Sequence, residues 1–267
     1  MKSPVFTEDR EIWQRDDGMT VVARRPFFRD YFDYKAGQHI VWGGPSTRGK
    51  TTAAFDALEY IANPTLPAYI AVSKPRDPVT SQRGHKLGYR FVQEWPVPKK
   101  IGEMFGGQAP SGYVIWPQFG DLETDMDRCA TITYTLLMER YAAGARKNAH
   151  GGILMMDDTM VKAKIMGLDK PMVTILAMAG AMDLGLWIFI QKPTDSGRVA
   201  VWGYENAIHL FLTKGGDARM LARYVEIIGG VNGVKAKRVI PTLTDFQFLY
   251  VHKTEGFMCI VDAGEQR

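Results

Sequence analysis

Short apolar runs alternate with amphipathic stretches along the chain from residue 38 onward. The apolar runs predict strands at residues 39–42, 68–73, 112–116, 152–157, 186–191 and 207–212. The amphipathic stretches predict helices at residues 51–62, 122–147, 170–183 and 217–228, with Asp217 as the N-cap of the last one. Strands that alternate with helices are typical of a mostly parallel sheet with crossover helices. The pattern therefore predicts a three-layer α/β fold.

The two ends of the chain depart from this alternation. Residues 1–37 are predicted to form an N-terminal extension that packs on the main domain, which comprises residues 38–267. Within the extension, residues 21–23 predict a strand. At the other end, residues 246–251 and 257–261 predict two strands joined by a tight turn, which together form a C-terminal β-hairpin.

A phosphate-binding loop occupies residues 44–51, between the first predicted strand of the main domain and its first helix. The segment has the form G-x-x-x-x-G-K-[ST], and with one further residue it supplies the predicted nucleotide contacts Gly44, Pro45, Ser46, Thr47, Arg48, Gly49, Lys50, Thr51 and Thr52. The glycines let the backbone fold around phosphates, and the helix N-terminus adds N–H donors. Lys50 can reach the β- and γ-phosphates, and the Thr51 hydroxyl can bind Mg²⁺. The context therefore predicts a site for a nucleoside triphosphate.

Paired carboxylates end the strand predicted at residues 152–157. Asp157 is expected to contact Mg²⁺ directly or through water, and Asp158 is expected to act as the general base on the attacking water. Taken without the phosphate loop, the pair could equally end a strand and cap a helix. Two predicted strands separate Asp157 from the loop in the sequence. This spacing suits ATPases in which another strand is inserted between the loop strand and the carboxylate strand.

A glutamine ends the next predicted strand. Gln191 is expected to sense the γ-phosphate, because the strand that follows the acidic strand ends beside it in sheets of this kind. The alternative is that Gln191 only bonds the backbone of a nearby loop.

Composition bounds the class of protein and leaves its partner open. The 267 residues carry a net charge of +4, which is compatible with a nucleic-acid partner without being diagnostic of one. The two cysteines, Cys129 and Cys259, suggest neither a disulfide framework nor a zinc motif, so a reducing cytoplasm is the expected location. We find no apolar signal segment and no apolar run long enough to span a bilayer, and we expect a soluble protein. His209 is expected to be a hydrogen-bonded core residue.

Further motifs follow one another between about residues 38 and 230. They are Ser73-Lys74-Pro75-Arg76-Asp77-Pro78, Leu137-Met138-Glu139-Arg140-Tyr141, Ile190-Gln191-Lys192-Pro193, Ile208-His209-Leu210-Phe211-Leu212 and Gly216-Asp217-Ala218-Arg219. With the phosphate loop, their order resembles the FtsK/HerA superfamily of ring-forming DNA-pumping ATPases, which includes the packaging ATPases of double-stranded DNA viruses. The resemblance implies a P-loop core with a RecA-like sheet, ATP and Mg²⁺ as ligands, and a homo-oligomeric ring of five or six subunits.

Ring ATPases of this kind complete each active site with an arginine from the neighbouring subunit. Arg146 is the favoured residue and Arg219 the second, ahead of Arg140 and Arg198. Each of them could instead be a solvated surface side chain.

The resemblance also implies double-stranded DNA as the partner, moved during virus genome packaging. Three lysines that follow the acidic strand are expected to contact DNA phosphates, or else to be solvated loop residues: Lys162, Lys164 and Lys170. A portal or capsid vertex protein is a further expected partner, which would place the chain in the host cytoplasm and transiently at a capsid vertex.

Departures from the family pattern leave two other functions open. The loop interior, residues 45–48, lacks the family's small Gly-rich stretch, Asp158 replaces a Glu, and residues 177–182 lack an arginine. These differences motivate a nucleotide-gated assembly protein with weak turnover as an alternative. A P-loop kinase of a small substrate is the other alternative, although the sequence contains no arginine-rich lid cluster.

Overall fold

A mixed β-sheet forms the centre of the structure, a computed structural model that describes residues 11–97, 109–117, 120, 122–146, 151–194, 197–215 and 217–263. Its strands, as far as the described residues show them, follow the order β1-β2-β11-β10-β9-β3-β8-β7-β4-β6-β5. Their bounds are β1 Ile12–Gln14, β2 Thr20–Ala23, β3 Ile40–Gly43, β4 Ala68–Ala71, β5 Arg90–Val92, β6 Gly112–Ile115, β7 Gly152–Met156, β8 Leu184–Ile190, β9 His209–Thr213, β10 Phe248–His252 and β11 Phe257–Asp262. All neighbouring pairs from β9 to β5 are parallel, whereas β10 runs antiparallel to both β9 and β11.

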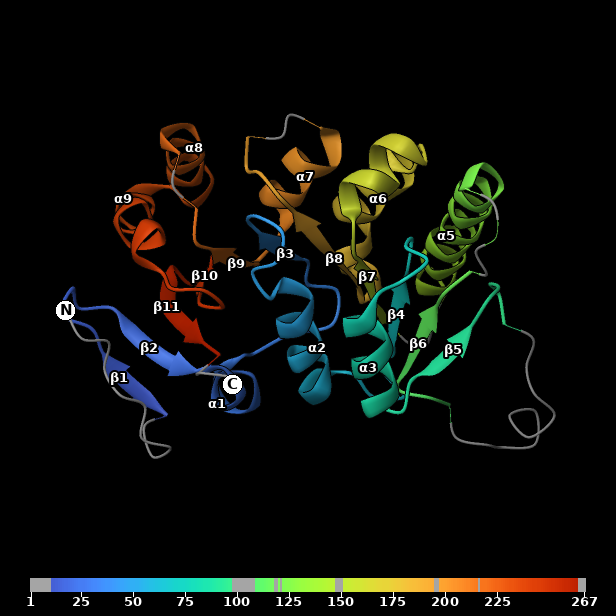
Figure 1. Ribbon diagram of the computed structural model, residues 1–267, viewed down its shortest axis with the longest axis horizontal. Coiled ribbons are helices and arrows are strands. Elements are labelled where there is room, and N and C mark those ends of the chain that lie inside the picture. Colours follow the sequence, from blue (N-terminus) through green and yellow to red (C-terminus); the bar gives the residue numbers. More distant parts are fainter. Residues whose placement is uncertain are drawn as a thin grey trace.

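Helices cover both faces of this sheet (Figure 1). One face carries α5 (Leu122–Gly144), α6 (Asp169–Met178), α7 (Arg198–Asn206), α8 (Ala218–Ile228) and α9 (Gly230–Val239). The other face carries α1 (Arg24–Pro26) with the helical turn η1 (Phe27–Tyr31), α2 (Lys50–Ile61) and α3 (Pro78–Lys86). The predicted three-layer α/β architecture is confirmed. Among the described helices, none has both the length and the apolar character needed to cross a bilayer.

The order of the strands agrees with the spacing of the motifs. β8 lies between β3, which leads into the phosphate loop, and β7, which leads into the paired carboxylates. This is the inserted strand that the sequence predicts. The C-terminal hairpin is also present, because β10 and β11 pair antiparallel with Tyr250 opposite Cys259.

The apolar pattern misses several elements. β5 is only three residues long, so its apolar run is too short to detect. α3 has few apolar positions and begins at an Asp77 N-cap. α7 contains Gly203, which packs closely on β8, because a Cβ atom there would lie 2.2 Å from the end of the Ile188 side chain. These elements depend on contacts with the sheet more than on their own periodicity.

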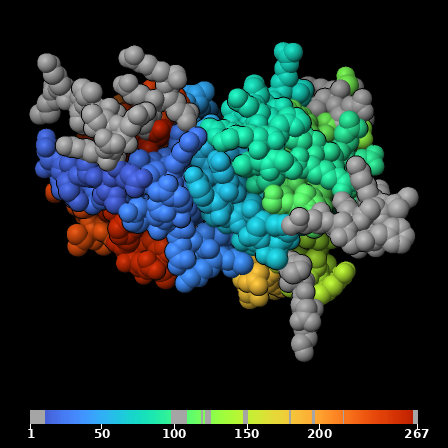
Figure 2. All heavy atoms as spheres, turned by 90° about the horizontal axis from the view of Figure 1, so that it is seen from below, coloured from blue at the N-terminus to red at the C-terminus, as the bar shows by residue number. Residues whose placement is uncertain are grey.

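The described part of the predicted extension belongs to the same sheet. β2 pairs in parallel with β11, and Val21 lies opposite Ile260. Figure 2 shows the blue N-terminal segment directly beside the red C-terminal residues. After β2 the chain places Phe27 and Phe28 in the core, where the Phe27 ring lies 4.8 Å from that of Tyr250. Residues 1–10 lie outside the described residues.

A buried ion cluster ties this segment to the helix that follows the phosphate loop. The Asp56 carboxylate of α2 forms ion pairs with the guanidinium groups of Arg24 and of Arg83 in α3, with N–O distances of 3.1 and 2.8 Å. The Asp56 side chain is only 6% exposed. Because a buried carboxylate needs partners to offset its lost hydration, these arginines hold three elements on one face of the sheet in a fixed arrangement.

His209 is a hydrogen-bonded core residue, in agreement with the sequence interpretation. Its Nε2 lies 2.8 Å from the Gln38 side-chain oxygen, and its Nδ1 lies 2.9 Å from the Tyr250 hydroxyl. The Gln38 oxygen can only accept, so Nε2 carries the proton and the hydroxyl donates to Nδ1. Burial lowers the pKa of His209 to about 3. His39, whose Nδ1 accepts the backbone N–H of Leu186, has its pKa lowered by burial to about 4.

The two buried histidines make the stability of the fold depend on pH. Both stay neutral in the folded protein, while the unfolded chain binds protons below about pH 6.5. Their contribution is therefore complete above pH 6.5 and is lost as the pH falls toward 4, at roughly 1 kcal/mol per pH unit for each histidine. Urea unfolding between pH 7 and 5 should show a smaller decrease in the free energy of unfolding for His209→Gln than for the wild type. Equal decreases would contradict a neutral buried His209.

Candidate functional site

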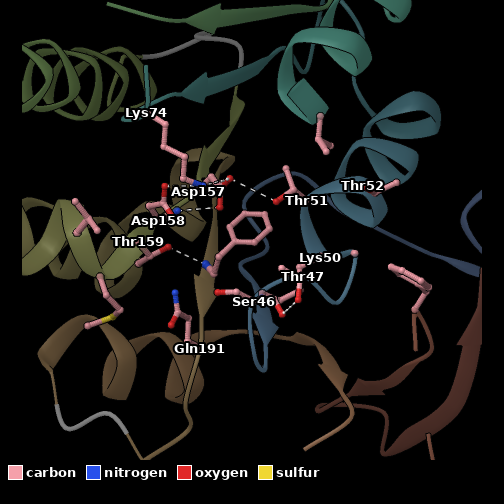
Figure 3. A pocket seen from close by; sticks show the side chains of 16 residues that line it. Ser46, Thr47, Lys50, Thr51, Thr52, Lys74, Asp157, Asp158, Thr159 and Gln191 are labelled. Atoms are coloured by element: carbon pink, nitrogen blue, oxygen red, sulfur yellow. Dashed lines mark hydrogen bonds and ion pairs between the residues drawn. The ribbon is translucent and has the colours of Figure 1, made fainter. Parts of the chain in front are cut away.

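A cavity of about 330 Å³ opens where the parallel strands β3, β7 and β8 end. Its wall combines residues from the phosphate loop, from the segments after β4, β7 and β8, and from the segment before β10 (Figure 3). The lining residues are Ser46, Thr47, Gly49, Lys50, Thr51, Thr52, Lys74, Val79, Asp157, Asp158, Thr159, Met160, Val161, Phe189, Gln191 and Phe246. Of the predicted loop contacts, Gly44, Pro45 and Arg48 lie outside this lining.

The phosphate loop is anchored on the two strands beside β3. The Gly44 N–H donates to the carbonyl of Ile190 in β8 at 2.8 Å. On the other side, a Cβ atom at Gly44 would lie 1.9 Å from the Thr213 hydroxyl of β9, and the φ of Gly44 is 124°. Only glycine fits such a position, because it needs both a positive φ and a close approach. The loop therefore depends on the sheet as well as on its own sequence.

Lys50 lies within the loop. Its ammonium donates to the carbonyls of Gly44 at 2.7 Å and Pro45 at 2.6 Å. Burial lowers the pKa of Lys50 to about 8, although the nearby carboxylates of Asp157 and Asp158 act in the opposite direction. A buried cation that bonds only carbonyl oxygens here is well placed to bind phosphate oxygens instead.

The predicted carboxylates end β7 and face the start of α2. The Thr51 hydroxyl lies 3.4 Å from the Asp157 carboxylate, and the backbone N–H of Asp158 donates to the same carboxylate at 2.9 Å. Asp158 has a φ of 49°, in the left-handed region. Asp and Asn adopt this region more readily than other non-glycine residues. The backbone here therefore favours Asp over the Glu that the resemblance leads one to expect at this position.

Thr159 fixes this strand end against its neighbour. Its hydroxyl donates to the Met156 carbonyl at 2.6 Å and accepts the backbone N–H of Phe189 at 2.7 Å. Both bonds are buried, so they hold the carboxylates at a defined height relative to β8.

Lys74 is a further residue of the site, and in the sequence it stands out only as part of the motif at residues 73–78. Its ammonium lies 2.8 Å from the Asp158 carboxylate and 3.6 Å from that of Asp157 (Figure 3). Burial lowers the pKa of Lys74, but the attraction of both carboxylates outweighs this effect and leaves the pKa above its usual value. Lys74 follows β4, which pairs with β7, so knowledge of that pairing would have identified it.

Lys162 does not contact DNA, and the prediction for this residue is wrong. Its side chain is fully buried in the turn η2 (Val161–Ile165), below the paired carboxylates. The ammonium donates to the backbone carbonyl of Asp157 and to the Ser73 hydroxyl, the latter at 3.1 Å. Lys162 therefore supports the carboxylate segment from below. Lys164 and Lys170 are exposed, and their contact with DNA stays a prediction.

Gln191 lines the cavity directly after β8, where the sequence places it, and its role as a sensor stays a prediction. The arginines lie apart from it. Arg219, in the first turn of α8, lies at the edge of the sheet where the cavity opens, because α8 follows the end of β9. Arg146 lies beyond the end of α5, near the start of β8 and hence toward the opposite edge. Both are exposed, and their action on a neighbouring subunit stays a prediction.

Two other arginines have partners within the chain. Arg140 bonds the Tyr69 hydroxyl at 2.8 Å and the adjacent Glu139 carboxylate, so it is held inside its own subunit. Arg48 points out of the loop and pairs with Asp245, which precedes β10.

The residues of the cavity fit Mg²⁺ and a triphosphate. Mg²⁺ prefers hydroxyl and carboxylate oxygens together with phosphate oxygens and water, and Thr51 and Asp157 supply one oxygen of each protein type. In the described part of the chain no group of three His, Cys, Asp or Glu side chains could hold a metal without such a ligand. Thr51 and Asp157 would leave the other coordination positions of Mg²⁺ to phosphate oxygens and water.

Comparison with known proteins identifies the fold. No protein-family model and no curated protein matches the chain. VirB4 of Thermoanaerobacter pseudethanolicus matches with a TM-score of 0.60 and 10% identity, covering 97% of each chain. The genome packaging NTPase B204 from Sulfolobus turreted icosahedral virus 2 matches with a TM-score of 0.55 and 14% identity, covering 84% of this chain and 96% of that one. At these identities the likeness shows the fold alone, and that fold is the one of FtsK/HerA-type P-loop ATPases.

Substitution of Lys162 tests whether this residue supports the fold or contacts DNA. We expect Lys162→Ala to lower the free energy of unfolding by about 2 kcal/mol, because the Asp157 carbonyl and the Ser73 hydroxyl lose their donor. Lys170→Ala is the matched control, since this side chain is exposed, and its effect should stay within about 0.5 kcal/mol. Urea unfolding of both variants measures the difference, and equal small effects would contradict the buried contacts.

Proposed function

We propose that the protein hydrolyses Mg²⁺-ATP and that a homo-oligomeric ring of it uses this reaction to move double-stranded DNA, in the packaging of a viral genome. One observation carries the ATPase part: Lys50, Thr51 and Asp157 converge on one cavity beside Asp158. Lys50 and Thr51 open α2 directly after the phosphate loop, whereas Asp157 follows β7, so their convergence is a property of the fold.

Binding would exchange contacts that already exist in the cavity. Lys50 would leave the carbonyls of Gly44 and Pro45 for the β- and γ-phosphate oxygens, while backbone N–H groups of the loop bind the remaining oxygens. Thr51 and Asp157 would hold Mg²⁺. When bound, this ion neutralises charge on the phosphate oxygens and orients them.

Asp158 would act on the attacking water. Its carboxylate lines the cavity next to the side chains that would hold the metal. As general base it would take the proton of the water as the water oxygen bonds the γ-phosphorus, while the bond from that phosphorus to the β,γ-bridging oxygen breaks and ADP leaves. To do so it must separate from Lys74, which lies 2.8 Å away. The separated Lys74 would then face the negative charge of the γ-phosphate. Gln191, at the end of β8, would report that charge to the loop that follows it.

The DNA part of the proposal rests on the exposed basic segment after β7 and on the fold. Lys164 and Lys170 are exposed in this segment, where they could track phosphates without reading bases. One structure of the same fold is a genome packaging NTPase of a virus. A ring of five or six subunits, with Arg146 or Arg219 reaching the neighbouring cavity, and docking to a portal or capsid vertex protein in the host cytoplasm complete the proposal.

A nucleotide-gated assembly protein with weak turnover is the second candidate function. The ion pair between Lys74 and Asp158 favours it, because Asp158 must separate from Lys74 before it can act on a water. The two candidates differ in steady-state turnover, and a kinase of a small substrate would differ from both in having no response to DNA.

Phosphate release measured with and without duplex DNA tests the proposed function. We expect turnover by the wild type, stimulation severalfold by duplex DNA, and loss of both in Lys50→Ala. Lys86→Ala is the control, because Lys86 is exposed on α3 and pairs only with Glu59 across 3.4 Å. Bound ATP without turnover would favour the second candidate, and turnover indifferent to DNA would refute translocation.

Exchange of the proposed general base tests the chemistry. Asp158→Asn keeps the shape of the side chain and suits the φ of 49°, but it cannot accept the proton. We expect turnover to fall by about a hundredfold or more, while ATP affinity changes little. Single-turnover phosphate release and equilibrium ATP binding measure the two quantities. Unchanged turnover would assign the base to another group.

A further inference from the structure

Phe246 lines the cavity in an unusual backbone conformation. Its φ is 67°, in the left-handed region that bulky residues avoid, and its side chain is about half exposed at 49%. Such a conformation costs conformational free energy and persists only where the surroundings hold it, which is common at binding sites. An exposed phenyl ring in a strained conformation at a cavity calls for an explanation beyond core packing.

The segment around Phe246 is held on both sides. Asp245 pairs with Arg48 of the phosphate loop. The Gln247 side chain accepts the backbone N–H of Thr244 at 2.9 Å and donates to the Asp262 carboxylate of β11 at 2.6 Å. These contacts join the segment to the phosphate loop on one side and to the C-terminal hairpin on the other. The strained residue between them therefore has a defined position.

The ring of Phe246 lies against the phosphate loop itself. A Cβ atom at Gly49 would come within 2.9 Å of the ring, so the ring contacts the loop backbone directly. The other aromatic ring in the described lining, Phe189, is only 4% exposed and offers no free face. Phe246 is thus the aromatic surface of the cavity that a ligand can reach.

The direction of a bound triphosphate places its base at this end. The terminal phosphate must face Asp157 and Asp158, since these carboxylates act on Mg²⁺ and on water. The chain of phosphates then runs over the loop toward the first turn of α2. The nucleoside would leave the loop on the side away from the carboxylates, where Figure 3 shows Thr52. Phe246 also lines the cavity and lies against Gly49 of the loop.

We propose that Phe246 is the surface on which the base of the bound nucleotide stacks, and that the Arg48–Asp245 ion pair positions it. This inference rests on the proposed nucleotide binding. Because every base presents a π-face, the contact would distinguish a nucleotide from an inorganic triphosphate without selecting one base strongly. It also gives a role to Arg48, which pairs with Asp245 and lies outside the cavity lining.

Binding of ATP and of inorganic tripolyphosphate to the full chain tests the proposal. We expect Phe246→Ala to weaken ATP binding about tenfold and to leave tripolyphosphate binding unchanged, while Phe246→Tyr keeps both. Phe246→Gly accepts the positive φ without strain, so an equal loss of ATP affinity in this variant assigns the effect to the ring. Arg48→Ala should weaken ATP binding severalfold. Phe257→Ala is the matched control, since its ring is 47% exposed at the start of β11, outside the cavity lining.

The outcomes separate this inference from the proposed function. If the wild type binds ATP and tripolyphosphate equally well, or if Phe246→Ala weakens both to the same extent, the stacking surface is refuted while nucleotide binding stands. An unchanged ATP affinity in Phe246→Ala refutes it as well. If the wild type binds neither ligand, the proposed function fails and this inference with it.

Discussion

The parallel register of β3, β8 and β7 is the constraint on which the site depends. Gly43 lies opposite Ile190, and Ile188 lies opposite Met156, so the three strands end within two residues of each other. Two side contacts fix these ends, the bond from the Gly44 N–H to β8 and the pair of bonds made by Thr159. A shift of one residue in either pairing would turn the side chains to the other face of the sheet. The phosphate loop, the carboxylates and Gln191 would then no longer share a cavity.

The charges around the cavity are arranged for a ligand with several negative charges. Lys50, Lys74 and Lys162 all interact with the carboxylates of Asp157 and Asp158, so positive charge is in excess at this point. Backbone carbonyls stabilise part of this positive charge, because they accept hydrogen bonds from the ammonium groups of Lys50 and Lys162. The buried Lys162 bonds the backbone of Asp157, Lys50 bonds carbonyls of the phosphate loop, and Lys74 pairs with the carboxylates at the cavity wall. One chemical group thus serves three different purposes, according to its burial and its partners.

Local sequence patterns predicted the elements and motifs of the site, whereas the side-chain contacts that they missed join residues far apart in the chain. The phosphate loop, the strand before Asp157 and the inserted strand follow from motifs and their spacing, and the resemblance adds the class of ATPase fold. The basic cluster was misread for Lys162, because the neighbouring lysines share its sequence context while the turn η2 directs only this side chain inward. Lys74 could be identified as a residue of the site only once the pairing of β4 with β7 was known. Arg48 and Asp245 are 197 residues apart, so their contact leaves no mark in either local sequence.

The pairing of β2 with β11 has a consequence for how the chain assembles during synthesis. β2 leaves the ribosome early, yet its parallel partner β11 is the last of the described strands to be synthesised. β3 likewise waits for β8 and β9, the two strands on which its loop is anchored. Contacts between distant parts of a chain form slowly, and unpaired strand edges invite association with other chains in the meantime. A ribosome-bound chain that ends before β8 therefore has the motif of the phosphate loop without the strand that joins it to the carboxylates.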